Sequence, residues 1–289
     1  MALVRCVTNA LAGAALAVAP VFGWAQTSAP TETAPMRVVS MNLCTDQLAM
    51  LLAAPGQLLS VSYLAFDPMG SAMADEAKAY QRNHGLAEEI YLLEPDLVIA
   101  GSFSTRATVA MLRRLGLPVA VMEPAYSLED VRARILEMGE ILHRQEAAAE
   151  MVAQYDADLA RIRQNVPQTH PLAALYAANG YTSGDRSLRG QILTAAGFRN
   201  AAVEAGFPMG GVFPLELLAL SDPDALILGR RYPAASRSEE ILDHPVVQAL
   251  ASNRMQGSVT DRDWVCGTPY VLRAISGLAA LHDQPKEAQ

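Results

Sequence analysis

One stretch of this chain occurs twice, and the repeat limits the possible folds more than any other feature. Residues 88–101 align without a gap on residues 216–229, at a constant offset of 128 positions. Six positions hold the same residue in both copies: a glutamate, a leucine, a proline, an aspartate, an isoleucine and a glycine. Each copy predicts a helix, a Pro-Asp turn and a buried strand. Two related lobes are the simplest architecture, and 289 residues allow each lobe its own core.

Apolar runs alternate with amphipathic stretches on both sides of the chain's midpoint. Runs of this kind predict buried strands of mainly parallel sheets, with helices on both faces. The predicted strands are residues 37–41, 58–62, 97–100, 118–122, 172–178, 225–228 and 257–260. The clearest predicted helices between and after them are residues 105–115, 187–196 and 269–281. We therefore expect an α/β fold with an N-terminal lobe at residues 37–126, a C-terminal lobe at residues 166–289 and a ligand cleft between them.

A long helical pattern separates the two lobes. Residues 127–165 contain no internal proline, and Ser127 followed by Asp130 is typical of a helix start. A helix of about 37 residues would span roughly 55 Å, enough to bridge two lobes. Two helices broken near Gly139 or at residues 143–145 are the alternative. Because neither place has clear turn residues, we expect one bridging helix.

The first 25 residues have the features of a secretory signal peptide. Arg5 supplies positive charge, residues 11–21 are apolar, and Gly23 and Ala25 provide small side chains for cleavage. The apolar run is shorter than the ~20 residues that a membrane-spanning helix needs, which disfavours a membrane anchor. Residues 26–36 predict a linker. We therefore expect a periplasmic protein that has lost its signal peptide.

Charge and missing motifs narrow the possible functions. The formal net charge of −8 and the lack of a Lys/Arg run argue against binding to nucleic acid. The chain lacks G-x-S-x-G, H-E-x-x-H, C-x-x-C and G-x-G-x-x-G, and its five histidines are scattered. We therefore expect neither enzymatic activity nor a resident cofactor. An exported two-domain enzyme or a metal-ion binding protein that uses the same cleft is the alternative.

Several short motifs follow one another in a distinctive order. They are RVVSM at 37–41, LEPDLVIA at 93–100, LGLPV at 115–119, YTSG at 181–184 and AGFRN at 196–200. In this order they resemble the helical-backbone periplasmic binding proteins that serve vitamin B12, iron-siderophore and haem importers. The resemblance covers the chain from about residue 37 to its end. It implies a ligand cleft between two lobes, no chemistry on the ligand, and delivery to the permease dimer of an ABC importer. We expect a monomer.

Glu88 and Glu216 begin the two copies of the repeat. They match the places where vitamin B12-type members carry one surface glutamate on each lobe, which meets arginines of the transporter subunits. Two carboxylates related by approximate symmetry suit a two-fold partner. The alternative is a pair of ordinary solvated glutamates. We expect transporter docking.

The loops that follow the predicted strands carry the candidate ligand-binding residues, because α/β lobes bind ligands at the carboxyl ends of their strands. Aromatic rings with a few polar groups suit a bulky, partly apolar ligand. The candidates are Asn42, Tyr63, Phe103, Arg106, Tyr126, Tyr181 and Trp264.

Tyr181 and Trp264 are the strongest of these candidates, because both flank turns that begin helices. A lone histidine such as His84 is more often solvated than a ligand to metal. Arg106 or Arg186 could pair with carboxylates or catecholates. The tryptophans of vitamin B12 binders have no clear counterparts here, which counts against a corrinoid. Iron-siderophore and haem stay open, and we expect the ligand to belong to one of these three classes.

Two cysteines, Cys44 and Cys266, remain once the signal peptide is removed. Each lies on a loop that we expect to face the cleft, one in each lobe. An even number of cysteines in an exported protein favours a disulfide, which would join the lobes and restrict their opening. The alternative is two free thiols that bind a metal or a thiol-reactive ligand.

Overall fold

The computed structural model describes residues 33–231 and 236–283. The predicted signal peptide and most of the predicted linker lie outside the described residues. The chain from Ala34 onward forms one unit, to which the following description applies. Within the described ranges, no helix is both long enough and apolar enough to cross a membrane.

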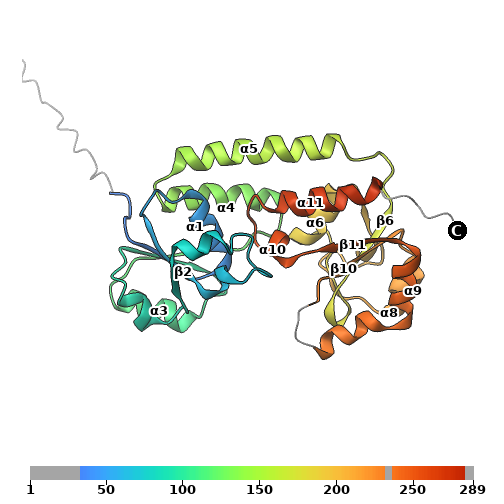
Figure 1. Cartoon of the computed structure of the whole chain (residues 1–289), viewed down its shortest axis with the longest axis horizontal. Helices are drawn as coiled ribbons and strands as arrows, with labels where there is room; N and C mark the ends of the chain where they lie inside the picture. The colour runs from blue at the N-terminus through green and yellow to red at the C-terminus, as the bar shows by residue number, and fades with distance from the viewer. Residues whose placement is uncertain (1–32, 232–235, 284–289) are drawn as a thin grey trace, which may run out of the picture. The chain divides into compact units, whose positions relative to one another are not determined.

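The N-terminal lobe is built on a five-stranded sheet in the order β3-β2-β1-β4-β5 (Figure 1). Every neighbouring pair in it is parallel. Its strands are β1 (Val38–Ser40), β2 (Leu58–Ser62), β3 (Gln81–Asn83), β4 (Leu97–Gly101) and β5 (Val119–Met122). Its helices are α1 (Leu43–Leu52), α2 (Ala87–Tyr91) and α3 (Arg106–Arg114), with 3-10 turns η1 (Tyr63–Phe66) and η2 (Glu76–Ala79).

Both faces of this sheet are covered, which explains the continuous apolar strands. Val38 and Ile99 pack into a cluster that includes α1, whereas their neighbours Val39 and Val98 pack into another that includes Ile90 of α2. Alternate side chains of one strand therefore reach opposite layers, and neither face needs polar residues.

The C-terminal lobe holds a second parallel sheet in the order β11-β10-β6-β8, with a separate antiparallel pair, β7-β9. Its strands are β6 (Leu172–Tyr176), β7 (Tyr181–Thr182), β8 (Arg199–Asn200), β9 (Gly211–Val212), β10 (Ala225–Gly229) and β11 (Met255–Val259). Its helices are α6 (Leu188–Ala195), α7 (Ala201–Glu204), α8 (Leu215–Ser221), α9 (Pro245–Asn253), α10 (Asp261–Trp264) and α11 (Val271–Ala279). Shorter 3-10 turns are η3 (Ala178–Gly180), η4 (Arg237–Asp243) and η5 (Ala280–Asp283). The predicted α/β fold with two lobes and parallel sheets is confirmed.

The two copies of the repeat fold alike. In each copy a short helix, α2 or α8, leads through a turn into a central strand, β4 or β10. The turn contains a residue with left-handed backbone at the same place in both copies: Glu94 has φ 48° and Asp222 has φ 43°. The 128-residue offset therefore relates structure as well as sequence.

The repeated aspartate fixes the start of the neighbouring strand. Asp96 accepts hydrogen bonds from the backbone N–H groups of Met36 and Arg37, at 2.8 and 3.0 Å, just before β1. Asp224 accepts one from the N–H of Leu172, at 2.8 Å, where β6 begins. Because these amides lie before the strand or at its first residue, the carboxylates satisfy donors at the start of each strand. The Pro-Asp turn thus anchors the first strand of each lobe.

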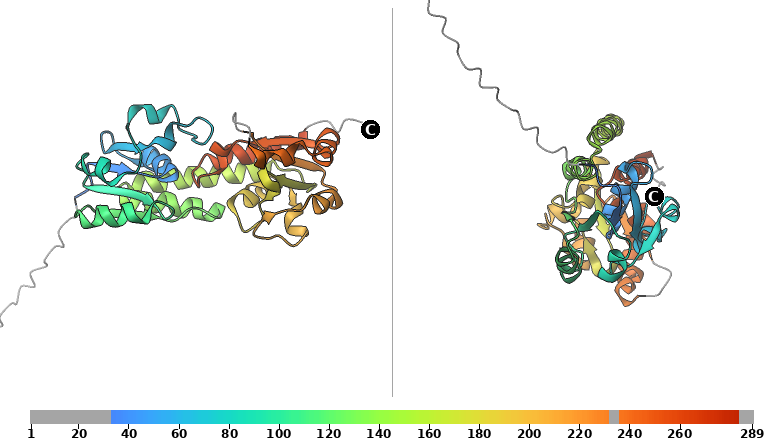
Figure 2. Two further views of the ribbon diagram at one scale, coloured as in Figure 1. Left: turned by 90° about the horizontal axis from the view of Figure 1, so that it is seen from below. Right: turned by 90° about the vertical axis from the view of Figure 1, so that its left-hand side faces the viewer.

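The prediction of a single bridging helix over residues 127–165 is wrong. Ser127 caps the start as expected, with its Oγ 3.0 Å from the N–H of Asp130. The segment then forms two helices, α4 (Leu128–Ile141) and α5 (Gln145–Gln164), which lie side by side and leave only α5 to lead into the C-terminal lobe (Figures 1 and 2). With 20 residues, α5 spans about 30 Å.

A local turn and a close contact explain the break. The chain reverses at His143, which takes a left-handed backbone with φ 56°. Gly139 does not break α4. It allows the helices to approach, because a Cβ at this position would lie 2.4 Å from the Cβ of Ala148 on α5. The sequence alone does not distinguish the two places, because the contact between Gly139 and Ala148 forms only in the folded chain.

The largest apolar cluster continues from one lobe into the other. It contains Val38 of β1, Ile135 of α4, Tyr155 of α5, Ala173 of β6 and Ile275 of α11, all buried. The helix pair α4–α5 therefore joins the lobes through a common core as well as through the chain.

Candidate functional site

The carboxyl ends of the N-lobe strands form one edge of the sheet, and aromatic side chains gather there. Tyr63 follows β2, Phe103 follows β4 and Tyr126 lies four residues beyond β5. Their side chains are exposed by 49%, 80% and 54%. Because all five strands are parallel, their loops meet at this edge, where open α/β sheets bind ligands. The three rings predicted from sequence therefore share one edge and are accessible.

The polar candidate residues of the N-terminal lobe differ in their contacts and exposure. Asn42 caps α1, since its Oδ1 accepts a hydrogen bond of 3.1 Å from the N–H of Cys44. Arg106 begins α3 and is exposed. His84 stacks on Tyr63 with 5.6 Å between ring centroids, and its Nδ1 lies 3.1 Å from Glu89. Within the described residues, no group of three or more His, Cys, Asp or Glu side chains could hold a metal ion.

A cavity of about 440 Å³ lies at the corresponding edge of the C-lobe sheet. Residues at or just beyond the ends of β6, β10 and β11 line it, and so do Tyr181 and Trp264, the two strongest candidates from sequence. Tyr181 is 47% exposed, whereas Trp264 is 5% exposed. Tyr181 therefore presents an accessible ring, and Trp264 forms part of the wall.

A small network holds Trp264 in the cavity wall. Its Nε1 donates a hydrogen bond of 3.0 Å to Oδ1 of Asp261. The guanidinium of Arg189 lies over the indole ring, 4.6 Å from its centroid, and forms a 3.0 Å ion pair with the same carboxylate. The wall therefore combines an aromatic surface with a guanidinium whose charge is balanced by a neighbouring carboxylate.

Sequence reasoning missed several residues of this cavity. Arg189, Arg230 and Asp261 all line it but were not proposed. Arg230 directly follows β10, so the strand-end rule used elsewhere would have found it. Arg189 and Asp261 come from α6 and α10, 72 positions apart, and no sequence signal pairs them. The exposed Arg186, which was considered instead, does not line the cavity.

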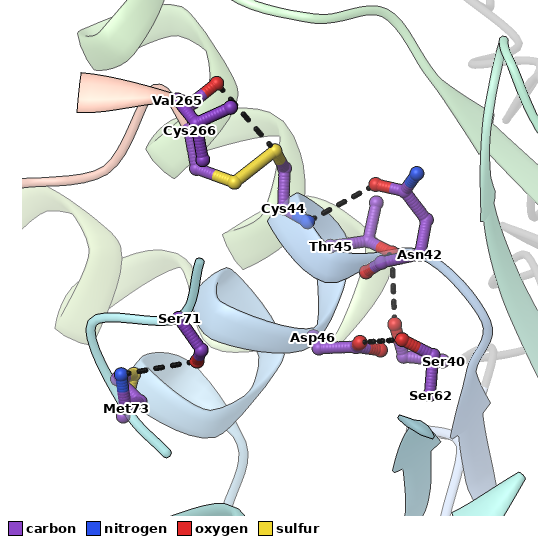
Figure 3. The surroundings of a disulfide bond; sticks show 10 residues. All are labelled: Ser40, Asn42, Cys44, Thr45, Asp46, Ser62, Ser71, Met73, Val265 and Cys266. Carbon is purple, nitrogen blue, oxygen red and sulfur yellow. Dashed lines mark hydrogen bonds between the residues drawn. A yellow bond between two sulfur atoms is a disulfide. The ribbon is translucent and has the colours of Figure 1, made fainter. Parts of the chain in front are cut away.

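A disulfide joins Cys44 of the N-terminal lobe to Cys266 of the C-terminal lobe (Figure 3). Cys44 lies in the first turn of α1, directly beyond β1, and Cys266 lies beyond β11 and α10, with 5.0 Å between their Cα atoms. The predicted bond between the lobes is confirmed, in place of two free thiols. It links the lobe that carries the exposed rings to the lobe that holds the cavity.

A buried carboxyl group lies on α1 below the disulfide (Figure 3). Asp46 is fully buried, and this burial raises its pKa from 3.8 to about 6. Ser62 donates a hydrogen bond of 2.5 Å to Oδ2, while Oδ1 has no hydrogen-bond partner among the described residues. The incomplete solvation explains why the neutral acid is favoured below pH 6.

Glu88 and Glu216 lie far along the sequence from each other but at equivalent places in the fold. Each occupies the first turn of its helix, α2 or α8, and each is exposed. An exposed carboxylate there can meet a basic partner without rearrangement of its own lobe.

Comparisons with known proteins place this geometry in context. A family model described as "Periplasmic binding protein" matches residues 38–255. A cobalamin-binding protein of Halobacterium salinarum is 26% identical over 210 residues, covering 70% of this chain and 56% of that protein. The ferric enterobactin-binding periplasmic protein FepB of Escherichia coli is 25% identical over 190 residues, covering 61% and 60%. The chain thus spans little more than half the length of these curated relatives.

Solved structures share the fold. The periplasmic haem-binding protein HutB of Vibrio cholerae matches with a TM-score of 0.72 at 18% identity, covering 86% of this chain and 99% of that chain. The periplasmic haem-binding protein RhuT of Roseiflexus sp. RS-1 matches with a TM-score of 0.70 at 21% identity, covering 86% and 98%. At these identities the likeness concerns the fold.

Proposed function

Because the chain belongs to the periplasmic binding protein family, we propose that it is the substrate-binding component of an ABC importer. In this proposal the chain is exported, loses residues 1–25 and binds its ligand as a monomer in the periplasm. It then delivers the ligand to a permease dimer and catalyses no reaction. Three observations support the proposal: exposed aromatic rings on loops of one lobe, a cavity in the other lobe, and the Cys44–Cys266 bond that joins the two lobes.

The chemistry of the cleft favours a bulky ligand with a flat or apolar body and anionic groups. Tyr63, Phe103 and Tyr126 offer accessible rings on one side, and Tyr181 offers another at the cavity. Arg230 lines the same cavity and suits a carboxylate or catecholate, which guanidinium binds with two hydrogen bonds. Asn42, Arg106 and Trp264 complete the proposed site at its rim and wall. Haem, a ferric siderophore and a corrinoid fit this description, and the curated relatives are named for two of these three classes.

Direct binding tests this proposal. The purified protein would be titrated separately with haem, ferric enterobactin and cyanocobalamin, and binding followed by absorbance and by quenching of intrinsic fluorescence. We expect one class to bind with a dissociation constant of about 1 μM or lower, as for ligands that fill a preformed pocket. Failure of all three to bind below about 100 μM would reject the proposed ligand classes.

A matched pair of tyrosines tests the position of the site. Tyr181 and Tyr91 are almost equally exposed, at 47% and 48%, but only Tyr181 lines the cavity. Tyr181→Ala should weaken ligand binding about tenfold, because an aromatic contact is lost, whereas Tyr91→Ala should leave it unchanged. Equal affinities for the two variants would place the ligand elsewhere.

We propose Glu88 and Glu216 as the two docking carboxylates for the permease dimer. Their support is the matching place of the two residues in the repeat and their exposure on equivalent helices. Glu88→Arg with Glu216→Arg should reduce ligand uptake about tenfold or more, because the reversed charges repel a basic pocket on the permease. The affinity of the protein for its ligand should stay unchanged. Glu146→Arg with Glu150→Arg makes the same charge change on exposed positions of α5 and serves as the control. Uptake at the control rate in the first variant would remove both glutamates from the interface.

A further inference from the structure

Four of the six identities in the repeat have a reason within the fold. The proline and the aspartate build the turn that anchors the neighbouring strand. The isoleucine is a core residue, since Ile99 and Ile227 are 0% and 1% exposed. The glycine permits a close approach, because a Cβ at Gly101 or Gly229 would lie 2.9 or 3.2 Å from a neighbouring side chain. Packing therefore explains these four positions.

The two remaining identities are the glutamate and the leucine, and both are exposed. Leu92 and Leu220 are 79% and 80% exposed, so each leaves most of its apolar surface in water. Each follows its glutamate by four positions, and the N–H of Leu92 bonds to the carbonyl of Glu88, one helical turn away. Residues four apart lie on the same face of a helix. Each lobe thus presents a carboxylate and an exposed leucine together.

The match is specific to these two positions. The residue before the leucine is also exposed in both copies, but it is Tyr91 in one and Ala219 in the other. The residue after the glutamate is half-buried and is Glu89 in one copy and Leu217 in the other. Neighbouring positions have therefore diverged around an unchanged glutamate and leucine.

We propose that Leu92 and Leu220 are the apolar contacts of the permease dimer, each packing beside a docking glutamate on one subunit. The inference rests on the proposed docking role of Glu88 and Glu216. A two-fold partner presents the same pocket twice, so it demands the same chemistry at both equivalent places of the two lobes. An apolar side chain that covers a charged contact also excludes water from it, as around the strongest contacts of protein interfaces. A single asymmetric partner would not require the leucine twice.

The experiment measures binding of the protein to the host's own permease–ATPase complex in lipid nanodiscs, by surface plasmon resonance. The variants are Leu92→Ser with Leu220→Ser, and Glu88→Gln with Glu216→Gln. The control is Leu115→Ser with Leu136→Ser, two leucines that are 44% and 43% exposed outside the repeat. We expect each exposed leucine of the repeat to contribute about tenfold in affinity, as for burial of a leucine side chain. Ligand titration and thermal melting confirm that each variant is folded and loads ligand.

Ionic strength distinguishes the apolar contact of the leucines from the charged contact of the glutamates. Affinity lost in the leucine variant should stay lost at every ionic strength, whereas the effect of the glutamate variant should shrink as salt rises. If the glutamate variant binds weakly but the leucine variant binds like its control, the leucine inference is overturned and the docking proposal stands. If neither variant differs from the control, the docking role of the glutamates fails, and the leucine inference fails with it.

Discussion

Removing the disulfide should destabilise the protein strongly, because the bond closes most of the chain into a loop. Cys44 and Cys266 are 222 positions apart. For a loop of that length, loop-closure entropy of the unfolded chain corresponds to about 5 kcal/mol at 25 °C. Measured losses for native disulfides run from about 2 to 5 kcal/mol, so we expect a loss of about 3–5 kcal/mol. Cys44→Ala with Cys266→Ala is the preferred variant, since Cys266 is buried and serine would bury a hydroxyl group.

Thermal unfolding followed by circular dichroism measures this loss. In a protein of this size, 1 kcal/mol shifts the melting temperature by about 2–4 °C, so the variant should melt about 10 °C lower. The wild type in a thiol reductant should melt at the temperature of the variant, and the variant itself should not respond to reductant. A drop smaller than about 2 °C, or a wild type that reductant leaves unchanged, would refute the argument from loop closure.

Three further predictions concern single residues. The pKa of Asp46 is about 6 in the folded protein and about 3.8 in the unfolded chain. The contribution of Asp46 to the free energy of unfolding therefore falls by about 3 kcal/mol as the pH rises between these values. Asp46→Asn should remove this fall when the free energy of unfolding is measured by urea titration across pH 4–7. A variant whose free energy of unfolding changes with pH in parallel with that of the wild type would contradict the prediction. Gly139→Ala should cost about 1–3 kcal/mol through overlap with Ala148, whereas Gly277→Ala, where no described atom lies within 4 Å of the added Cβ, should not destabilise the protein. His143→Gly should stabilise the protein by up to about 1 kcal/mol, because its left-handed backbone suits glycine; a lower urea midpoint would argue against this.

The sequence predicted the longer strands of both parallel sheets, most of which are largely buried, but not the two- and three-residue strands β3, β7, β8 and β9. Runs such as residues 97–100 and 225–228 are apolar throughout, and the repeat confirmed that they are equivalent. The break between α4 and α5 was not predictable in the same way. Its left-handed turn residue is His143, with no glycine, asparagine or proline to mark it, and its reason is a contact between Gly139 and Ala148.

The candidate site was predictable where a residue lies in the loop after a strand or beside a turn that begins a helix. The first rule found Tyr63, Phe103 and Tyr126 and also covers Arg230, and the second found Tyr181 and Trp264. Arg189 and Asp261 were missed because their position depends on how α6 packs against α10, which no local pattern encodes. The burial of Trp264 has in part the same origin, since the guanidinium of Arg189, distant in the sequence, lies over its ring.

The common core has a consequence for how a loaded protein is distinguished from an empty one. Apolar contacts that run from Val38 through Ile135 and Tyr155 to Ile275 would have to break if the lobes swung far apart, and the Cys44–Cys266 bond also joins the two lobes. The frame is therefore rigid, and the span between Glu88 and Glu216 should hardly change when the cleft fills. A transporter that binds both carboxylates would then find nearly the same distance between them with and without ligand. It must therefore distinguish the two states by contact with the ligand at the mouth of the cleft, or by a small rotation of the lobes, rather than by closure of a hinge.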